Sequence, residues 1–366
     1  MNELKNQLPE SVPPLNSYYV YMTGGCNLAC KHCWIAPTFQ PNGATGGHLD
    51  YELLKMAINE GIPLGLRHVK LTGGEPLLHP DFIRIVDLLK KKQLGLTIET
   101  NGVLMEESLV QHLKQSGALH HISISLDGAI PETHDPFRGV KGCFEKTCKA
   151  IRLLAETGFR PQVIMSIHKD NVSEMEALVN LSIRLGASSV KFNLVQPSGR
   201  GDAMASRGDT LDIYRLVDLG KWVETSLQKT ASIPLFFSWP SAFFSLKRLM
   251  SDSGQSCQLK NILGILHSGH LAMCGIGMEV PELCYGKLGE DNVQKIWISN
   301  PILKQVREKL PWELEGICHE CIFRNHCQGF CVAENYLATK KLTSPYWFCQ
   351  QAREAGLFPT SRTYAI

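Results

Sequence analysis

The sequence predicts an α/β protein: a partial (β/α)6 barrel of the TIM type, followed by an irregular, cysteine-rich domain. Two observations predict this class. From 17 to about 196, short β-type runs alternate with segments of helical period, whereas beyond about 236 the alternation stops and cysteines accumulate. Alternating strands and helices favour a parallel sheet with helices outside it, and six such units are too few for a closed eight-stranded barrel.

The strands of the predicted barrel are short runs rich in β-branched, aromatic and aliphatic residues. They cover 17–23, 68–72, 95–100, 121–126, 162–167 and 190–195. Helical-period segments lie between them, several ending in glycine, a common helix stop, at 50–61, 80–92, 105–117, 144–158 and 172–186. A sixth helix is expected over about 209–229. The expected organisation is an N-terminal extension, a barrel and a second domain, over 1–16, 17–235 and 236–366.

The second domain shows little regular apolar patterning. Hairpin-like pieces such as 269–274 and one helix near 301–309 are the regular elements expected there. The stretch 257–349 looks too poor in apolar pattern to fold on a conventional core. We therefore expect its cysteines to hold it together through metal.

Composition narrows the class of protein and its compartment. The formal net charge is only +2, so no basic face demands nucleic acid as a partner. The apolar runs are shorter than a membrane span, and the polar N-terminus lacks the apolar stretch of a signal peptide. These features predict a cytoplasmic protein, in whose reducing surroundings cysteines are metal ligands more often than disulfides.

The cysteines are unevenly distributed along the chain. There are thirteen, three of them within 26–33 and eight within 257–349. Cys143 and Cys148 fall between these groups, at i and i+5 of a helical pattern, and are expected to be small core residues. The two groups therefore indicate two kinds of metal centre.

Polar residues and glycines gather at the expected carboxyl ends of four consecutive strands. The first strand runs into Cys26, and the next three end in "TGGEP" (72–76), "ETNG" (99–102) and "SLDG" (125–128). In barrels of this kind the chemistry occurs at that end of the strands. We expect a ligand site there.

The first cysteine group is Cys26, Cys30 and Cys33, with the spacing C-x3-C-x2-C. Iron–sulfur clusters are held by cysteine thiolates, normally four. Three thiolates can hold three corners of one cluster and leave one iron open to an outside ligand. A zinc site completed by His32 or a distant residue would use the same thiols, and coincidence is the third reading.

This group resembles the signature of the radical SAM enzymes, C-x3-C-x-φ-C, in which φ is usually aromatic and is here His32. The resemblance extends to "GGEP", which in the family binds the amino group of S-adenosylmethionine (SAM). It implies that Cys26, Cys30 and Cys33 hold a [4Fe–4S] cluster that binds SAM. It also implies SAM contacts from the segment Gly73, Gly74, Glu75 and Pro76. Glycines permit close backbone approach, and Glu75 would accept hydrogen bonds from an ammonium group.

Further residues match the SAM site of the family. Ser125 resembles a serine that contacts the SAM ribose or carboxylate, and Arg138 an arginine that pairs with the carboxylate. Simpler readings are a turn residue for Ser125 and a solvated loop charge for Arg138. Asn101 is expected at the same mouth, although an Asn-Gly turn explains it equally well. Leu194 and Val195 would pack on the adenine, or are plain core.

The second cysteine group resembles the SPASM domain, with zinc as the alternative metal for its C-x2-C pair. Eleven residues separate Cys257 from Gly269, and four more precede Cys274. A C-x2-C-x5-C-x3-C run follows, and seventeen residues separate its end from a last cysteine. The resemblance implies one fully ligated auxiliary [4Fe–4S] cluster on Cys318, Cys321, Cys327 and Cys349. It implies a second on Cys257, Cys274 and Cys331, whose fourth ligand is uncertain. Relatives place a cysteine where this chain has Leu263, and Cys284 is the nearest unassigned thiol.

The resemblance implies radical chemistry on a peptide. One electron from the reduced cluster cleaves SAM, and the resulting 5′-deoxyadenosyl radical abstracts hydrogen from an inert C–H bond. SPASM enzymes mostly act on peptides or proteins, so the first hypothesis is a maturase of a ribosomally made peptide, by backbone excision, crosslinking or epimerisation. The "CWIAP" after the third cysteine resembles maturases of nif11-type precursors. The roughly sixteen residues before the first strand leave no room for a fused peptide-recognition domain, so leader recognition would need a separate protein or the enzyme's own surface. An electron donor such as flavodoxin or ferredoxin is implied.

Two other functions compete with this hypothesis. Anaerobic sulfatase-maturing enzymes share the architecture but carry a general-base aspartate just after the cysteine of the G-x4-C element, where this chain has Gly275. A non-enzymatic iron–sulfur electron carrier, or a zinc-stabilised interaction protein, belongs to another class. The carrier reading leaves "GGEP" and the open three-cysteine site unexplained.

Overall fold

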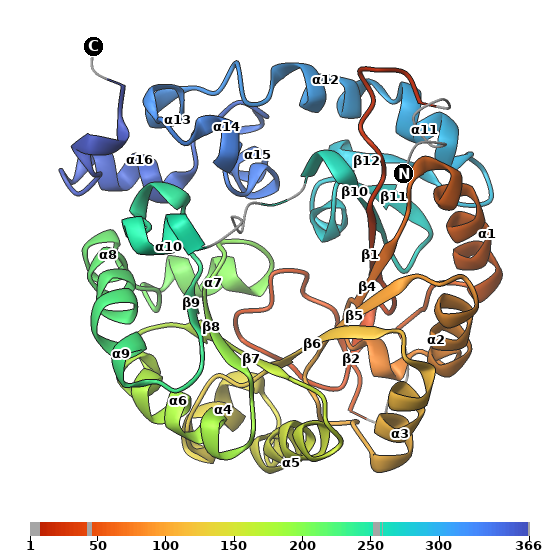
Figure 1. Cartoon of the computed structure of the whole chain (residues 1–366), viewed down its shortest axis with the longest axis horizontal. Helices are drawn as coiled ribbons and strands as arrows, with labels where there is room; N and C mark the ends of the chain where they lie inside the picture. The colour runs from red at the N-terminus through yellow and green to blue at the C-terminus, as the bar shows by residue number, and fades with distance from the viewer. Residues whose placement is uncertain (1–7, 42–45, 252–256, 258, 365–366) are drawn as a thin grey trace.

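The computed structural model describes residues 8–41, 46–251, 257 and 259–364, and its centre is a curved parallel sheet (Figure 1). All six predicted strands form, each within two residues of its predicted bounds. They are β1 (Ser17–Tyr21), β4 (His68–Thr72), β5 (Gly95–Thr100), β6 (Leu119–Ser125), β7 (Gln162–Ile167) and β8 (Ser189–Leu194). They lie in chain order and pair in parallel, so their carboxyl ends meet at one edge.

Helices cover the outside of this sheet, as the alternating pattern predicts (Figure 1). The crossover helices are α1 (Tyr51–Gly61), α2 (Phe82–Lys91), α3 (Glu107–Ser116), α5 (Cys143–Glu156), α6 (Met175–Arg184) and α8 (Ile213–Trp222). Local chemistry starts two of them: Asp50 accepts a hydrogen bond from the Leu53 amide (2.9 Å), and Asp212 does the same for Arg215 (2.8 Å). Shorter helices in this half are α4 (Pro131–Arg138), α7 (Arg200–Ser206), α9 (Gln228–Thr230) and α10 (Leu246–Ser251).

The chain beyond 234 extends the sheet at both edges. Strand β9 (Leu235–Phe237) pairs in parallel with β8, so the domain boundary predicted at 235 lies inside a strand. At the opposite edge, β10 (Ile262–Ile265) pairs in parallel with β1, and β11 (His270–Ala272) and β12 (Cys284–Lys287) follow antiparallel. The described sheet therefore has ten strands, in the order β12-β11-β10-β1-β4-β5-β6-β7-β8-β9.

The rest of the C-terminal region is more helical than the sequence suggests. The helix predicted near 301–309 is α12 (Pro301–Lys309). Five further helices form: α11 (Val293–Ser299), α13 (Gly316–Glu320), α14 (Arg324–Cys327), α15 (Val332–Thr339) and α16 (Trp347–Glu354).

The expectation that this region lacks a conventional core is wrong. Its apolar side chains join the same hydrophobic cluster as the barrel, and Trp297 and Phe348 are fully buried. The Phe243 ring packs edge-on against Phe348 (5.0 Å between centroids) and Phe358 (5.6 Å). The sequence pattern missed this core because it comes from short elements, each contributing a few large side chains. Burial of each such aromatic ring removes roughly 150–250 Å² from water.

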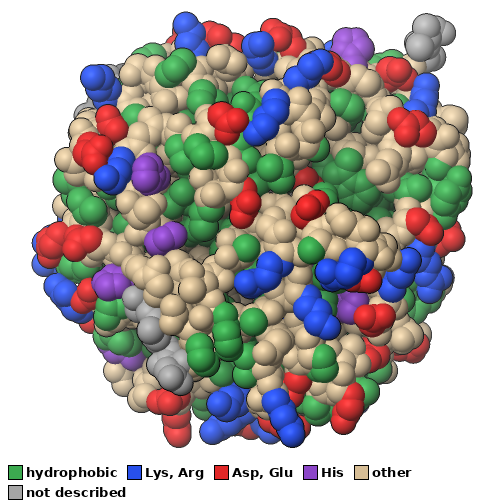
Figure 2. All heavy atoms as spheres, turned by 180° about the vertical axis from the view of Figure 1, so that it is seen from behind, with side chains coloured by type: hydrophobic (Ala, Val, Ile, Leu, Met, Phe, Trp, Pro, Cys, Tyr) green, Lys and Arg blue, Asp and Glu red, His purple; other side chains and the backbone are tan. Residues whose placement is uncertain are grey.

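Two expectations drawn from the sequence can be compared directly with the structure. Cys143 and Cys148 are buried on α5, and Cys148 belongs to the main core, as predicted. No helix that the structure describes is long and apolar enough to cross a membrane. On the face shown in Figure 2, basic and acidic side chains are interspersed rather than gathered by sign.

Candidate active site

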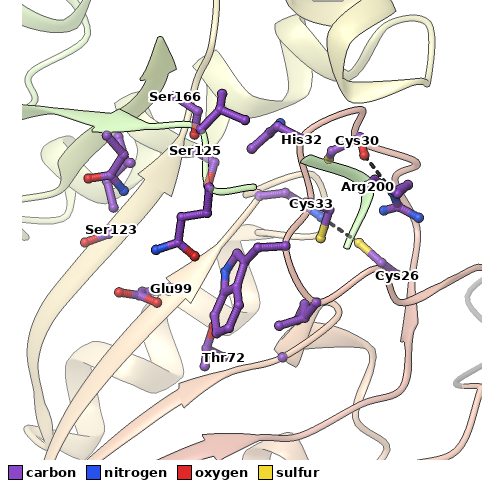
Figure 3. A pocket seen from close by; sticks show the side chains of 18 of the residues that line it. Cys26, Cys30, His32, Cys33, Thr72, Glu99, Ser123, Ser125, Ser166 and Arg200 are labelled. Atoms are coloured by element: carbon purple, nitrogen blue, oxygen red, sulfur yellow. Dashed lines mark hydrogen bonds between the residues drawn. The ribbon is translucent and has the colours of Figure 1, made fainter. Parts of the chain in front are cut away.

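A cavity of about 360 Å³ opens at the carboxyl ends of the barrel strands, where the sequence predicts a ligand site (Figure 3). All three cysteines of the first group line it. So do eight of the nine residues predicted to contact SAM, namely Gly73, Gly74, Glu75, Asn101, Ser125, Arg138, Leu194 and Val195. Pro76 is the exception; it is buried behind Glu75 and starts a short 3₁₀ turn.

The cysteine loop is fixed by backbone contacts to two other parts of the chain. Its short strand β2 (Gly25–Cys26) pairs with β3 (Thr38–Phe39). The Lys31 amide donates to the Phe137 carbonyl (2.9 Å) at the end of α4. Arg200 Nε donates to the Cys30 carbonyl oxygen (2.7 Å), and its Nη1 donates to that of Pro37 (3.2 Å). The loop is therefore held in place by the folded barrel around it.

The spacing of the sulfur atoms in this loop argues against a single ion. Four-coordinate zinc with Zn–S bonds of about 2.3 Å would bring thiolates within about 4 Å of one another. Among the described residues, three potential ligand atoms come within 4.8 Å of one another at His134, Asp135 and Cys143, not in any of the cysteine groups. At that one place the Asp135 carboxylate already caps α5, accepting the Phe144 amide (2.8 Å) and the Cys143 thiol (3.2 Å). In the structure without metal, therefore, no three of the described cysteines are arranged as a single zinc ion would hold them.

Burial favours the protonated thiols of Cys26 and Cys30 in the absence of metal. Burial raises the pKa of the Cys26 thiol, and the charge of Glu75 raises it further. Burial also raises the pKa of Cys30, which the guanidinium of Arg138 partly offsets. When a cluster binds, the thiols must lose these protons. Cluster binding is therefore coupled to deprotonation of the thiols.

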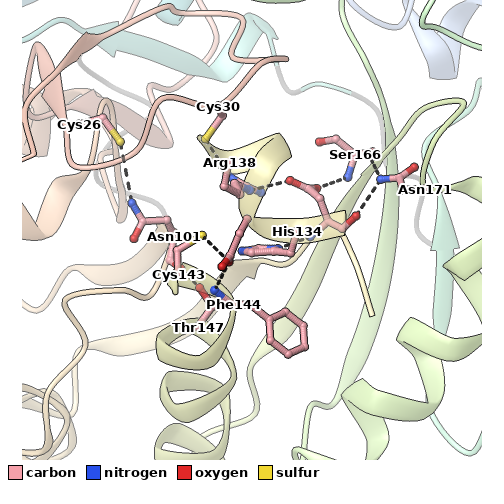
Figure 4. A network of polar contacts seen from close by, with 12 residues as sticks. Cys26, Cys30, Asn101, His134, Arg138, Cys143, Phe144, Thr147, Ser166 and Asn171 are labelled. Atoms are coloured by element: carbon pink, nitrogen blue, oxygen red, sulfur yellow. Dashed lines mark hydrogen bonds and ion pairs between the residues drawn. The ribbon is translucent and has the colours of Figure 1, made fainter. Parts of the chain in front are cut away.

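Arg138 is a buried, paired charge rather than a solvated loop residue, which settles that alternative (Figure 4). Its Nε lies 2.6 Å from Asp127 Oδ2, and its Nη1 donates to Cys30 Sγ (3.5 Å). Asp127 is itself held by the Ser166 amide (2.7 Å), and its backbone amide donates to His134 Nδ1 (3.1 Å). Burial alone would raise the pKa of Asp127, but Arg138 holds it below the ordinary value. A fixed cation therefore lies beside Cys30.

The "GGEP" segment joins the second strand end to the cysteine loop. A side chain at Gly74 would overlap the carbonyl oxygen of Gly25, and one at Gly73, where φ is +128°, would lie 2.7 Å from the Met22 amide. The Glu75 carboxylate accepts hydrogen bonds from Thr100 Oγ1 (2.6 Å), Leu77 N (3.1 Å) and Asn101 N (2.9 Å). Close backbone packing thus accounts for the glycines, and three contacts already hold the carboxylate.

Asn101 fits both predictions made for it, because it forms an Asn-Gly turn and also lines the cavity. Its side-chain oxygen accepts the Val103 amide (2.9 Å), as in an Asn-Gly turn. Its side-chain amide donates to Asn27 Oδ1 (2.8 Å) and lies 3.8 Å from Cys26 Sγ. The turn therefore places a donor beside the cysteine loop.

His32 takes the place of the usual aromatic residue by stacking. Its ring lies parallel to that of Phe137 (4.5 Å between centroids, 4° between planes), which stacks in turn on His168. Burial lowers the pKa of His32 to about 3, so the ring is neutral at physiological pH. The neutral imidazole of His32 therefore stacks on Phe137 as an aromatic side chain would.

The C-terminal cysteines form two sets. Cys318, Cys321, Cys327 and Cys349 surround a small cavity of about 20 Å³ whose other walls are mostly apolar. Burial raises the pKa of Cys349, and the charges of the other three cysteines raise it further, because all four lie close together.

In the second set, burial raises the pKa of Cys331 well above its ordinary value, with further contributions from Glu334, Cys274 and Cys257. The Cys284 thiol instead donates to the Gly277 carbonyl (3.5 Å), and burial raises its pKa. Leu263, at the alternative ligand position, is fully buried in β10. Cys284 as a fourth ligand stays a prediction.

Sequence reasoning did not single out several residues of the site, although two of them, Glu99 and Asp127, lie in the polar strand ends that it named. Asp127 and Arg200 hold Arg138 and the cysteine loop, and Lys70, Glu99 and Lys191 line the same cavity from inside the barrel. The strand alternation, which places every second residue inside, could have indicated the last three.

Known proteins resemble this chain in sequence and in fold. The Radical SAM superfamily model matches residues 20–182. The chain is 30% identical to an AdoMet-dependent heme synthase of Methanosarcina barkeri over 332 residues, covering 87% of this chain and 91% of that protein. It is 27% identical to the mycofactocin maturase MftC of Mycobacterium tuberculosis, covering 90% and 81%. The fold is similar to that of Streptococcus suis SuiB bound to its precursor peptide SuiA, with a TM-score of 0.71, 17% identity and coverage of 93% and 76%.

The chain therefore belongs to the radical SAM superfamily and is a radical SAM enzyme, with the [4Fe–4S] cluster and SAM that define the class. Within the superfamily it resembles the SPASM-type maturases of ribosomally made peptides, and it is also related to heme synthase.

Proposed function

We propose that the protein is a maturase of a ribosomally synthesised precursor peptide. One observation carries the proposal: a second cavity of about 830 Å³ adjoins the cysteine-lined cavity, and the two share Leu194, Val195 and Glu334 as walls. The second cavity is lined largely by apolar side chains, among them Leu211, Leu216, Leu337, Pro345 and Trp347. The second cavity offers an extended peptide segment a place beside the reacting centre, outside the cavity predicted to hold SAM.

The residues of the first cavity would hold SAM as follows. Cys26, Cys30 and Cys33 hold the cluster, which with bound SAM supplies a one-electron cleavage and a 5′-deoxyadenosyl radical that removes hydrogen from the substrate. Ser125 and Arg138 bind the SAM carboxylate. The "GGEP" segment (73–76) and Asn101 face the amino-acid part, where Glu75 retains one acceptor site for an ammonium group. Leu194 and Val195 contact the adenine.

The C-terminal cysteines would hold two auxiliary clusters, in the domain predicted over 236–366, whose first residues complete strand β9. Cys318, Cys321, Cys327 and Cys349 fully ligate one; Cys257, Cys274 and Cys331, with Cys284 as candidate fourth ligand, hold the other. Full occupancy corresponds to roughly twelve iron atoms per chain, against near zero for zinc. These clusters would accept an electron from the substrate radical or orient the substrate, and a flavodoxin or ferredoxin would reduce the first cluster.

A second candidate function is heme formation. The 30% identity to a heme synthase, over nearly its whole length, favours it. The same cavities would then admit a tetrapyrrole in place of a peptide.

The sulfatase-maturing alternative meets a steric obstacle. A side chain at Gly275 would overlap the Tyr21 ring and lie 2.7 Å from the Trp34 ring. An aspartate base at this position would therefore require both rings to move. The nif11-type assignment rests on the "CWIAP" letters alone and stays a prediction.

Coexpression tests the peptide proposal. The chain is expressed with a short precursor peptide encoded beside its gene, and the peptide mass is compared with that from cells carrying the Cys30→Ala chain. A mass change that requires Cys30 is the expected result. Heme formation in a strain that lacks its own heme synthase, with the peptide unchanged, would instead establish the second candidate. Repeating the coexpression with a neighbouring leader-binding protein shows whether recognition needs a partner.

A further inference from the structure

The interior of the barrel is charged on the side of the cavity away from the cysteine loop. We call this part the floor; it consists of Lys70, Glu99, Ser123 and Lys191, which come from strands β4, β5, β6 and β8. Figure 3 shows Glu99 and Ser123 across the cavity from the three cysteines. The interior of a TIM barrel is normally filled by branched apolar side chains. A floor of charged groups indicates that this part of the barrel binds a polar ligand.

Two members of the floor satisfy each other. Lys70 Nζ lies 3.0 Å from a carboxylate oxygen of Glu99 and 4.1 Å from the centre of the Tyr19 ring. Lys70 is thus held by an anion and an aromatic face, and the Glu99 carboxylate is committed to it.

Lys191 has no such partner. Its ammonium makes no hydrogen bond and no ion pair with any residue that the structure describes. Burial lowers the pKa of Lys191; Glu99 acts against this shift, and Lys70 and Arg248 add to it. Cys257, a proposed ligand of the second auxiliary cluster, acts on Lys70 rather than on Lys191. Among the described residues the floor has two lysines and one glutamate, and Lys191, half-buried at the cavity wall, is the lysine without a paired anion.

Asn193 provides a second unpaired group on the same strand. It follows Lys191 by two residues, lines the same cavity, and its Oδ1 is buried without a hydrogen-bond partner among the described residues. A ligand that brings an anion to Lys191 and an N–H donor to Asn193 would satisfy both. A carboxylate near an amide N–H is the combination that an amino-acid residue offers.

We propose that Lys191 binds a carboxylate of the substrate inside the barrel, while Asn193 accepts a hydrogen bond from an adjacent amide N–H. This inference rests on the proposed peptide function and narrows it to peptides whose reacting region carries an acidic side chain or a free C-terminus. Binding there would hold the substrate across the cavity from the cysteine loop, with SAM between them.

Small probes test this subsite without knowledge of the peptide. The reconstituted holoenzyme, with its clusters oxidised, is saturated with SAM so that the SAM carboxylate site is filled. NMR titration then compares N-acetyl-alanine, its amide, and N-acetyl-glutamate α-amide. We expect at least one acid probe to bind about tenfold more tightly than the neutral amide, as a charge-assisted hydrogen bond provides. Whichever acid probe binds more tightly shows whether the subsite recognises a chain terminus or a side chain.

Variants assign the preference to Lys191. In Lys191→Met the acid and amide probes should bind alike, whereas Lys149→Met, which removes an exposed lysine of α5, should keep the preference. Glu99→Gln should strengthen acid binding severalfold, because it removes the competing anion, and it provides the test if Lys191→Met does not fold. Equal binding of acid and amide by the unmodified protein, or a preference that survives Lys191→Met, would overturn the proposal. An acid preference without any peptide product would instead leave the subsite standing and overturn the peptide function.

Discussion

Two of the cysteine groups in the chain have opposite designs. Cys26, Cys30 and Cys33 lie on a loop that borders a polar cavity of about 360 Å³, beside the buried cation of Arg138. Cys318, Cys321, Cys327 and Cys349 surround a cavity of about 20 Å³ with mostly apolar walls. The first site leaves room for a ligand at the metal and supplies charge to hold it, whereas the second encloses what it binds. The difference teaches that the number of cysteines and the space around them together separate the site of the SAM-binding cluster from the site predicted to hold an auxiliary one.

The largest expected effect comes from removing the open site. Replacement of Cys26, Cys30 and Cys33 by Ala should abolish 5′-deoxyadenosine formation from SAM and dithionite and lower the iron content by about one third, or roughly four atoms. Replacement of Cys321 should remove auxiliary iron instead and leave SAM cleavage measurable. Cys148→Ala, on the barrel side, is the matched control for iron content. Residual SAM cleavage by the triple variant would remove the distinction between the two sites.

Loss of the Arg138–Asp127 ion pair beside Cys30 should have the second-largest effect. Asp127→Asn leaves Arg138 buried without its counterion, which we expect to lower the free energy of unfolding by about 3–5 kcal/mol and to weaken SAM binding. Denaturant unfolding and SAM titration of the anaerobic protein measure the two effects. Asp170→Asn, at an exposed position on the same side of the barrel, serves as control. A variant as stable as the parent would mean that the pair does not anchor the open site.

Acid should weaken the support of the open site. His134 is fully buried, and burial lowers its pKa from 6.5 to about 4. The unfolded chain therefore takes up the proton first, so stability is lost as pH falls below about 6.5, by about 2 kcal/mol between pH 7.5 and pH 5. His134→Asn keeps an acceptor for the Asp127 amide but cannot be protonated in this range. Its unfolding free energy should depend correspondingly less on pH; an unchanged pH dependence would contradict the assignment.

The smallest expected effect concerns the clamp on the cysteine loop. Arg200→Met removes hydrogen bonds to the carbonyls of Cys30 and Pro37, a loss of about 1 kcal/mol each at most. Iron should then leave the first site several times faster under a chelator, while auxiliary iron is retained. Arg207→Met, at an exposed arginine of the same segment, should change neither rate. Equal loss from all sites would show that Arg200 stabilises the fold generally.

The sequence by itself determined the features that depend on local spacing. Strand periodicity placed six strands within two residues of their bounds, and cysteine spacing indicated the first cluster and both later sets. "GGEP" could be read because its chemistry is contained in four adjacent residues. Such signals survive in sequence because neighbouring residues are held together by the chain itself.

The tertiary structure decided the features that depend on contacts between distant segments. Arg138 reaches Cys30 across 108 positions, and Arg200 reaches it across 170, only because the parallel sheet brings these strand ends to one edge. The pairing of β10 with β1 and the shared core of the C-terminal helices have no local signature either. The sequence likewise could not reveal that Lys191 is unpaired. The neighbours of a lysine in a strand are known only once the curved sheet has brought the other strands around it.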